Sequence, residues 1–374
     1  MSIKFVNTPS LEGMDAQITP VVGENPLCRI PSVRALYTAV SRQELMDHKP
    51  GTVQGFVLAF EEGLKNIVFA NLDCRHDHFK LVNTVAEAVR TAVEMHSQNI
   101  FVPVGTDFTD EEVSLICRGL MIGAYRFDLY KTEKSPKVRF TVYSERDYSA
   151  AVQNGKMLGE CTNLARDLVN TPGSDMTPVV LAQKAAAQAE LCGVKYEIFD
   201  EFEIEKMGMG SFLAVARGSV NPPRLIVLRY QGDPENDSTV ALVGKGITFD
   251  TGGYDIKDDE SMSTMKSDMG GAAAAIGAVL AIARAGIKAN VTAVVAACEN
   301  RVSGNAYLPG DVLRTMSGKT VEVINTDAEG RLTLIDAVTY AVQKENAFAV
   351  IDIATLTGGQ VVSPCYRYAA LISD

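Results

Sequence analysis

The feature that most restricts the fold of this chain is a repeated order of strand, loop and helix that begins near Thr239. The first strand of the series, residues 240–244, is a continuous apolar run. Strands that are apolar on both sides are typical of parallel sheets covered by helices on both faces. An alanine-rich helical segment (272–285) and a second strand (291–297) follow it. The pattern therefore predicts an α/β domain with a central, mostly parallel sheet flanked by helices.

The length of the chain, 374 residues, predicts more than one domain. Residues 1–145 also alternate between strand-like and helix-like segments and predict an N-terminal α/β domain. In this region we expect strands at 53–60, 66–70 and 99–104 and helices at 81–96 and 110–123. Residues 146–170 are amphipathic and predict a helix that links the domains, so residues 171–374 are expected to form the second domain.

Composition excludes several classes of protein. The net charge of −11 and the pI near 5.0 make a nucleic-acid-binding role unlikely. The N-terminus has no basic-then-apolar signal, and no run is expected to span a membrane, which predicts a cytoplasmic location. The cysteines are odd in number, widely spaced and free of C-x-x-C, which predicts reduced thiols. They are Cys28, Cys74, Cys117, Cys161, Cys192, Cys298 and Cys365.

Two carboxylates and a guanidinium lie within seven residues of one another, in the segment 325–331. A strand-like run precedes the segment and a helix-like run follows it, so we expect a turn at the carboxyl end of a strand, where α/β sheets bind ligands. Asp327 and Glu329 could reach one cation or a pair of cations. Arg331 could hold an anion through two hydrogen bonds. An acidic turn without a function would show the same residues, so this segment alone decides nothing.

A second group of charged residues follows the apolar strand. Lys245 and Asp250 lie at its end, Lys257 follows seven residues after Asp250, and Asp268 lies just before the alanine-rich helix. Taken singly, Lys245 and Asp250 could form a buried ion pair, and Asp268 could be a helix N-cap. Together with the first segment, however, the chain places four carboxylates at strand ends or helix starts, where they would repel one another without cations.

Two divalent cations would balance four carboxylates in formal charge, and a lysine beside them can ligate as a neutral amine. The residues alone therefore predict a two-metal hydrolase, with peptidase and phosphoesterase chemistry both open. The four histidines, His48, His76, His78 and His96, all lie in the first third of the chain. A Ser-His-Asp triad or an H-E-x-x-H zinc site would need one of them. His76 and His78 could ligate a metal, but two histidines on a short acidic loop are more often solvated.

The same segments resemble the leucyl aminopeptidase (cytosol aminopeptidase) family of dinuclear metallo-exopeptidases. The residues 325–332, Asn-Thr-Asp-Ala-Glu-Gly-Arg-Leu, match the signature of that family. Residues 243–253 and 265–272 match its other block at the family's spacing. The likeness is strong from about residue 158 to 357, and the variants at Tyr254 and 265–268 are similar to those of the bacterial peptidase B branch.

The resemblance implies a role for each matching position. The more loosely bound metal would be held by Lys245, Asp250, Asp268 and Glu329, and the tighter metal by Asp250, Asp327 and Glu329. The metals would be two divalent ions, zinc or manganese. Lys257 would polarise the scissile carbonyl, and Arg331 would hold a bicarbonate ion that acts as general base. The pocket for the first side chain would be lined by Met265, Thr355 and Gly358, and the pocket for the second by Asn325 and Ala328.

The resemblance also implies an activity and an assembly. A water or hydroxide that bridges the metals would attack peptides with a free N-terminus, releasing the N-terminal amino acid, and the protein would be a homohexamer. The catalytic domain of the family extends past the position of Asp374, so a truncated C-terminus is expected. The alternatives are an inactive member of the family, or one with a DNA-binding or assembly role.

Overall fold

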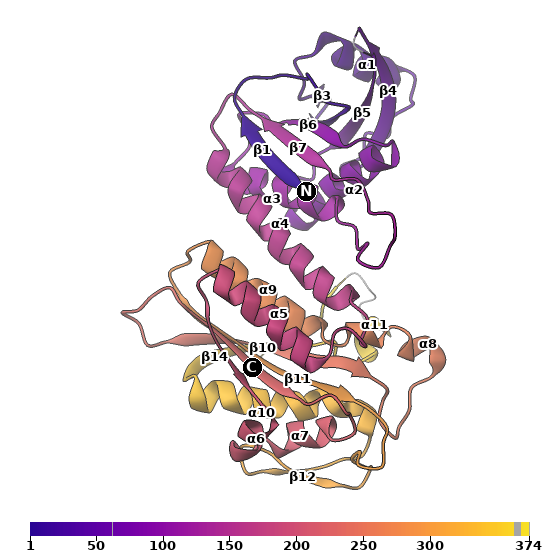
Figure 1. Cartoon of the computed structure of the whole chain (residues 1–374). Helices are drawn as coiled ribbons and strands as arrows, with labels where there is room; N and C mark the ends of the chain where they lie inside the picture. Colours follow the sequence, from indigo (N-terminus) through magenta and orange to yellow (C-terminus); the bar gives the residue numbers. More distant parts are fainter. Residues whose placement is uncertain (62, 363–367, 374) are drawn as a thin grey trace. The chain divides into compact units, whose positions relative to one another are not determined.

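The computed structural model describes residues 1–61, 63–362 and 368–373 (Figure 1). Cys365 and Asp374 lie outside the described residues; the other six cysteines are free thiols, as predicted. The chain forms two compact units, residues 1–163 and 164–374. The division falls within α4 (Ser149–Asn170), the helix expected at 146–170. Each unit contains a sheet and packed helices, so the predicted α/β class is confirmed.

The first unit is built on one sheet. In spatial order its strands are β1 (Ser2–Val6), β7 (Arg139–Tyr143), β6 (Asn99–Pro103), β2 (Ala16–Val22), β5 (Gly63–Asn71) and β4 (Val53–Phe60). Neighbouring strands are parallel except β4, which is antiparallel to β5, and the short β3 (Asn25–Pro26) pairs with β2. The sequence did not predict β1, β2 or β3. Nor did it predict β7.

Three helices, α1 (Pro31–Arg42), α2 (His78–Glu94) and α3 (Asp110–Gly123), belong to the first unit. The bounds of α3 are those expected from sequence. Its start is determined locally, because Thr109 and Glu112 form a reciprocal capping box. Helices α2 and α3 bury their apolar faces in one core with β2, β5, β6 and β7.

The second unit has a five-stranded sheet. In spatial order its strands are β14 (Ala347–Ile353), β10 (Thr239–Asp250), β11 (Asn290–Asn300), β9 (Arg224–Gln231) and β8 (Lys195–Phe199). β14, β10 and β11 are parallel, and β9 is antiparallel to both of its neighbours. Two of the four pairings are thus parallel, so the predicted parallel arrangement holds for β14, β10 and β11, and the most deeply buried strands, β10 and β11, lie side by side.

Helices cover both faces of this sheet (Figure 1). On one side lie α5 (Pro178–Leu191) and α9 (Gly270–Arg284), and on the other α10 (Glu329–Lys344), α7 (Gly210–Ala216) and α6 (Glu201–Lys206). By length and composition, residues 265–284 could cross a membrane. In the structure α9 buries eight residues of this stretch in the fold, as expected for a core helix.

The remaining elements are short. They are α8 (Asp259–Met262), α11 (Gly359–Val362), the 3-10 turns η1 (Met265–Ser267) and η2 (Thr326–Ala328), and the strands β12 (Val312–Arg314) and β13 (Thr320–Glu322). The last two form a hairpin, closed at Gly318 with a φ of 84°. Because β13 pairs with β12 in this separate sheet, the segment 325–331 does not leave a strand of the main sheet, and that expectation was wrong.

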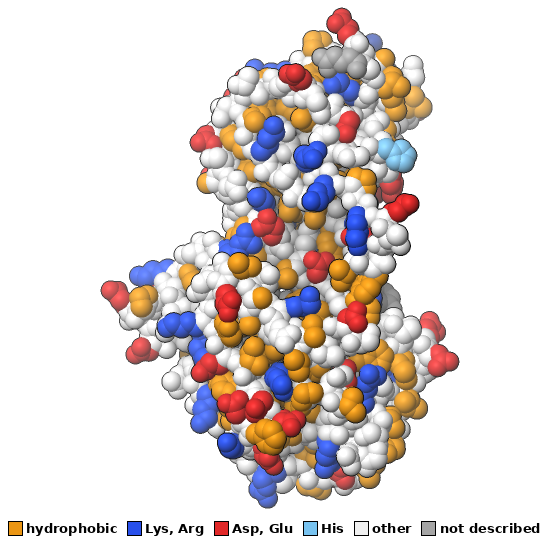
Figure 2. Space-filling view, in the orientation of Figure 1, with side chains coloured by type: hydrophobic (Ala, Val, Ile, Leu, Met, Phe, Trp, Pro, Cys, Tyr) orange, Lys and Arg blue, Asp and Glu red, His pale blue; other side chains and the backbone are white. Residues whose placement is uncertain are grey.

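The surface carries charges of both signs. On the face in Figure 2, the acidic and basic side chains of the described residues are interspersed rather than gathered in one patch. This arrangement agrees with the acidic net charge and adds no argument for a nucleic-acid-binding face there.

Candidate metal centre and active site

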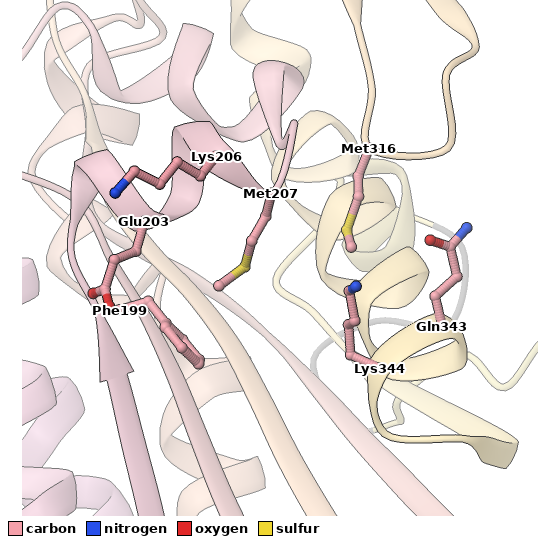
Figure 3. Close-up of a pocket in the computed structure, with 7 residues that line it drawn as sticks. All are labelled: Phe199, Glu203, Lys206, Met207, Met316, Gln343 and Lys344. Atoms are coloured by element: carbon pink, nitrogen blue, oxygen red, sulfur yellow. The ribbon is translucent and has the colours of Figure 1, made fainter.

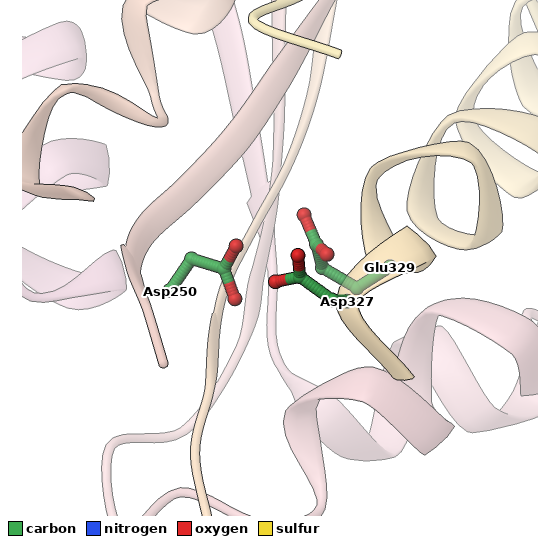
Figure 4. Close-up of side chains that lie close together, drawn as sticks. All are labelled: Asp250, Asp327 and Glu329. Carbon is green, nitrogen blue, oxygen red and sulfur yellow. The ribbon is translucent and has the colours of Figure 1, made fainter. Parts of the chain in front are cut away.

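The carboxylates singled out in the sequence meet in the second unit, beside the carboxyl end of β10. Asp250 is the last residue of β10, Asp327 lies in η2, and Glu329 is the first residue of α10. One oxygen atom from each of the three lies within 4.8 Å of the others, and Figure 4 shows the side chains converging. Asp268 reaches the same cluster through Lys245. Segments far apart in the sequence thus supply one buried acidic centre.

Lys245 lies within β10 and joins two of the carboxylates. Its Nζ atom is 2.8 Å from Asp268 Oδ1 and 2.8 Å from Glu329 Oε1, and it donates a hydrogen bond of 3.0 Å to the Thr355 carbonyl. Two alternatives from sequence are therefore wrong. Lys245 does not pair with Asp250, and Asp268 is not the N-cap of α9, a position that Met269 takes.

Lys257 joins the other two carboxylates. Its Nζ atom is 2.9 Å from Asp250 Oδ2 and 2.6 Å from Asp327 Oδ1. Asp327 is the more open member of the cluster, with 35% of its side chain exposed, whereas Asp250 is buried. The half of the centre around Lys257 is therefore more open to solvent than the half around Lys245.

The charges of the centre shift one another's protonation. Burial raises the pKa of Asp268 to about 6 and that of Glu329 to about 7, although the ammonium of Lys245 opposes both shifts. Burial alone would lower the pKa of Lys257, but hydrogen bonds to Asp327 and Asp250 outweigh it and raise that pKa. Without cations, the cluster therefore balances its charge with protons and two lysine ammonium groups.

The donor set fits divalent cations. Asp268 Oδ2 and Glu329 Oε2 are buried oxygen atoms that accept no hydrogen bond from the described residues. Such orphaned oxygens are costly to bury, and a cation would satisfy them. Carboxylate oxygens with one amine nitrogen suit manganese or zinc. The cluster therefore has the composition of a metal centre, and the assignment of each ligand stays a prediction.

Two glycines make the close approach of these side chains sterically feasible. A Cβ atom at Gly330 would lie 2.7 Å from Cε of Lys245. Only glycine at this position therefore leaves enough space for the lysine side chain beside the start of α10. Gly252 has a φ of 86°, which favours glycine, and a Cβ atom there would lie 2.9 Å from Asp327 Oδ1. Its amide N–H also donates to Asp250 Oδ1 at 2.8 Å.

The other residues predicted from sequence lie around this cluster in different ways. Arg331 is exposed in the first turn of α10. Asn325 accepts the N–H of Asp327 at 2.6 Å, so it orients a predicted ligand. Thr355 donates to Asp268 Oδ1 at 2.8 Å. The three that remain are the half-buried Met265 in η1, the half-buried Ala328 before α10, and the exposed Gly358.

Sequence reasoning missed the residues that hold the cluster together. Thr326 is buried, and its hydroxyl donates to the Gly252 carbonyl at 2.7 Å. The carboxylate of Asp255 accepts the N–H of Thr326 at 2.6 Å, and the hydroxyl of Tyr307 donates to the Thr326 carbonyl at 2.7 Å. Asn300 donates to Asp250. Thr326 was visible within the motif and Asn300 at the end of an apolar strand, but their partners are set by tertiary packing.

Cation binding at this centre is expected to depend on pH. Both Asp268 and Glu329 have pKa values above their ordinary ones, so the metal-free protein carries protons that a cation must displace. Mn²⁺ affinity should therefore rise from about pH 5 to about pH 8, by up to about tenfold per pH unit for each displaced proton. Calorimetric titration in two buffers of different ionisation enthalpy would measure the released protons. An affinity that is flat over this range would contradict the prediction.

A separate hollow in the second unit offers no comparable chemistry. It has a volume of about 450 Å³ and is lined by Phe199, Glu203, Lys206, Met207, Met316, Gln343 and Lys344 (Figure 3). Its one carboxylate, Glu203, accepts the N–H of Asp200 in a helix cap. We therefore place the candidate active site at the carboxylate cluster.

Comparisons with known proteins agree with this assignment. A model of the cytosol aminopeptidase family, catalytic domain, matches residues 163–374. A probable cytosol aminopeptidase of Clostridium perfringens is 41% identical over 375 residues, which cover 96% of this chain and 76% of that protein. One of Clostridium tetani is 39% identical, over 94% of this chain and 75% of that protein.

A solved structure shares the fold. The bottromycin maturation enzyme BotP, in complex with Mn, superposes with a TM-score of 0.79 at 29% identity, over 94% of this chain and 74% of that one. The fold, the site and these matches define a metal-dependent aminopeptidase, a hydrolase. Within that class, the chain belongs to the cytosol aminopeptidase family, which confirms the resemblance seen in the sequence. It spans about three quarters of the length of these relatives.

Proposed function

We propose that this chain removes N-terminal amino acids from peptides by two-metal hydrolysis. The observation that carries the proposal is the approach of Asp250, Asp327 and Glu329 within 4.8 Å, next to the Lys245–Asp268 pair. Family membership supports the substrate class. The proposal assigns this chemistry to residues 171–374, with residues 146–170 as a link and no catalytic role for residues 1–145.

In this proposal one cation would be held by Lys245, Asp250, Asp268 and Glu329, and a second by Asp250, Asp327 and Glu329. Zinc and manganese both suit this donor set, and the related BotP is described in complex with Mn. When bound, such a pair would supply Lewis-acid activation of a water nucleophile and of the substrate carbonyl.

The residues of the chain would do the remaining work. Lys257 lies beside Asp250 and Asp327, and once cations neutralise those carboxylates its ammonium can donate hydrogen bonds to the oxyanion that develops at the scissile carbonyl. Arg331 is exposed two residues after Glu329, in the first turn of α10, and could hold a bicarbonate ion as general base through its planar guanidinium. The substrate's α-amine would lie near Asp268.

Specificity and assembly follow from the resemblance to the family. The first side chain of the substrate would contact Met265, Thr355 and Gly358, and the second Asn325 and Ala328. The homohexamer is proposed on the same ground. A cytoplasmic location is supported by the name that the relatives carry, cytosol aminopeptidase.

The test is hydrolysis of leucine-p-nitroanilide by the chelator-stripped protein before and after addition of manganese or zinc. Activity that returns with metal and is absent in Asp327→Ala supports the proposal. Binding of metal without hydrolysis would favour the alternative, an inactive or DNA-binding member of the family, which a salt-dependent gel shift would examine. Phosphate release from an aryl phosphate would instead indicate a phosphoesterase. A protein that binds no metal would overturn the proposal.

A further inference from the structure

Asn300 is a fully buried polar residue that is neither a proposed metal ligand nor a proposed substrate contact. It ends β11 directly opposite Asp250, the end of β10, in the parallel register of the two strands. Its side-chain Nδ2 donates to Asp250 Oδ1 at 2.8 Å and to the Thr326 carbonyl at 3.0 Å. Its own carbonyl accepts the N–H and the hydroxyl of Thr251, each at 2.9 Å. One residue thus connects the end of β10, the loop toward Lys257 and the turn that carries Asp327.

The amide of Asn300 determines how the carboxylate of Asp250 is presented. Asp250 Oδ1 accepts two hydrogen bonds of 2.8 Å, from Asn300 Nδ2 and from the N–H of Gly252. The other oxygen, Oδ2, is left for the cluster, where it lies 2.9 Å from Lys257 Nζ. Rotation of the carboxylate would break both hydrogen bonds, so the two donors keep Oδ2 directed toward the position of the cations.

An uncharged donor is what this position requires. A carboxylate at residue 300 would add a negative charge beside Asp250, and an ammonium would compete with the cations for it. The amide has a drawback of its own, because Asn300 Oδ1 is buried and accepts no hydrogen bond from the described residues. A buried acceptor without a partner is destabilising. We infer that the two hydrogen bonds donated by the amide contribute more to the site than the unsatisfied Oδ1 atom costs in stability.

We propose that Asn300 is a positioning residue of the metal centre, which fixes Asp250 and the turn at Thr326 so that the carboxylates bind cations together. The inference rests on the proposed function, since it assumes that cations bind to these carboxylates. Groups that orient metal ligands without touching the metal typically change metal affinity by about 10–100-fold when removed.

The test compares Mn²⁺ affinity in the wild type, Asn300→Ala and the matched control Asn290→Ala. Asn290 begins the same strand, and its Nδ2 also donates to two oxygen atoms, here the carbonyls of Asp233 and Asn236 at the other end of β11 from Asp250. Calorimetric titration of the metal-free proteins should show affinity reduced about 10–100-fold in Asn300→Ala and unchanged in the control. Thermal unfolding of the metal-free proteins would show whether both variants lose similar stability.

The outcomes separate this inference from the proposed function. A wild type that binds no Mn²⁺ overturns both. Mn²⁺ affinity within twofold of wild type in Asn300→Ala overturns the role of Asn300 and leaves the proposed function intact. If circular dichroism shows that Asn300→Ala does not fold, Asn300→Ser replaces it, because serine is too short to reach both acceptors. Weaker Mn²⁺ binding in that variant supports the inference, and unchanged binding overturns it.

Discussion

Glu329→Gln is expected to lower hydrolysis of leucine-p-nitroanilide by at least about 10³-fold, equivalent to about 4 kcal/mol in activation free energy. Glu329 is buried, lies 2.8 Å from Lys245 Nζ and has a second oxygen that accepts no hydrogen bond. In the proposed centre Glu329 would be a ligand of both cations. The substitution keeps the shape of the side chain but removes its charge, so both metal positions should weaken together.

The matched control for this variant is Glu345→Gln, at the other end of α10. Glu345 forms an ion pair with Arg229, 2.6 Å from its Nε, outside the carboxylate cluster. This control should lose stability but keep its metal and its activity. Metal content after dialysis, measured by elemental analysis, distinguishes the two variants. Two retained metals and activity within tenfold of wild type in Glu329→Gln would show that Glu329 is not a ligand.

Lys257→Met should separate catalysis from metal binding. If the ammonium stabilises the developing oxyanion, kcat should fall about 10²–10³-fold. Metal affinity should not fall with it and should rise modestly, because in the metal-free structure Lys257 lies within 2.9 Å of both Asp250 and Asp327 and competes with a cation for them. Methionine retains most of the apolar length of the side chain without its charge.

Steady-state kinetics and Mn²⁺ titration of the same samples would measure both effects. Lys266→Met is the control, because Lys266 also precedes α9 but donates its hydrogen bond to the Asn170 carbonyl instead of a carboxylate. A loss of metal binding in Lys257→Met that parallels the loss of kcat would assign Lys257 a role in assembling the site rather than in catalysis.

Much of the fold followed from local signals. The alternation of strand-like and helix-like segments predicted α3 over its full length, and the structure shows that the capping box of Thr109 and Glu112 marks its start. The unbroken apolar run predicted a buried parallel strand, and β10 is one. The signals failed for β2, residues 16–22, whose buried face includes Gln17 and Thr19. These polar side chains bond to each other, a pairing that composition does not reveal.

The segment 325–331 shows the same contrast between local sequence signals and tertiary pairing. Asp327, Glu329 and Arg331 were singled out because two carboxylates and a guanidinium lie within seven residues, and the second group of charged residues gave that segment its meaning. The expectation that they leave a strand of the main sheet was wrong, because β13 pairs with β12 in a hairpin. A strand of the main sheet and a strand of a separate hairpin show the same apolar pattern in the sequence. The two differ only in the strand with which they pair.

The sequence by itself indicated a metal-dependent hydrolase, because four carboxylates at element ends repel one another unless cations or protons balance their charge. It also determined the family, through residues 325–332 and 243–253. Only the tertiary structure decided the pairing: Lys245 with Asp268, 23 residues away, and with the carbonyl of Thr355, 110 residues away. It alone revealed Asn300, since an asparagine has no recognisable role until the fold places its amide against Asp250. Charge can be read along a chain, but the direction of a hydrogen bond depends on what the fold places beside it.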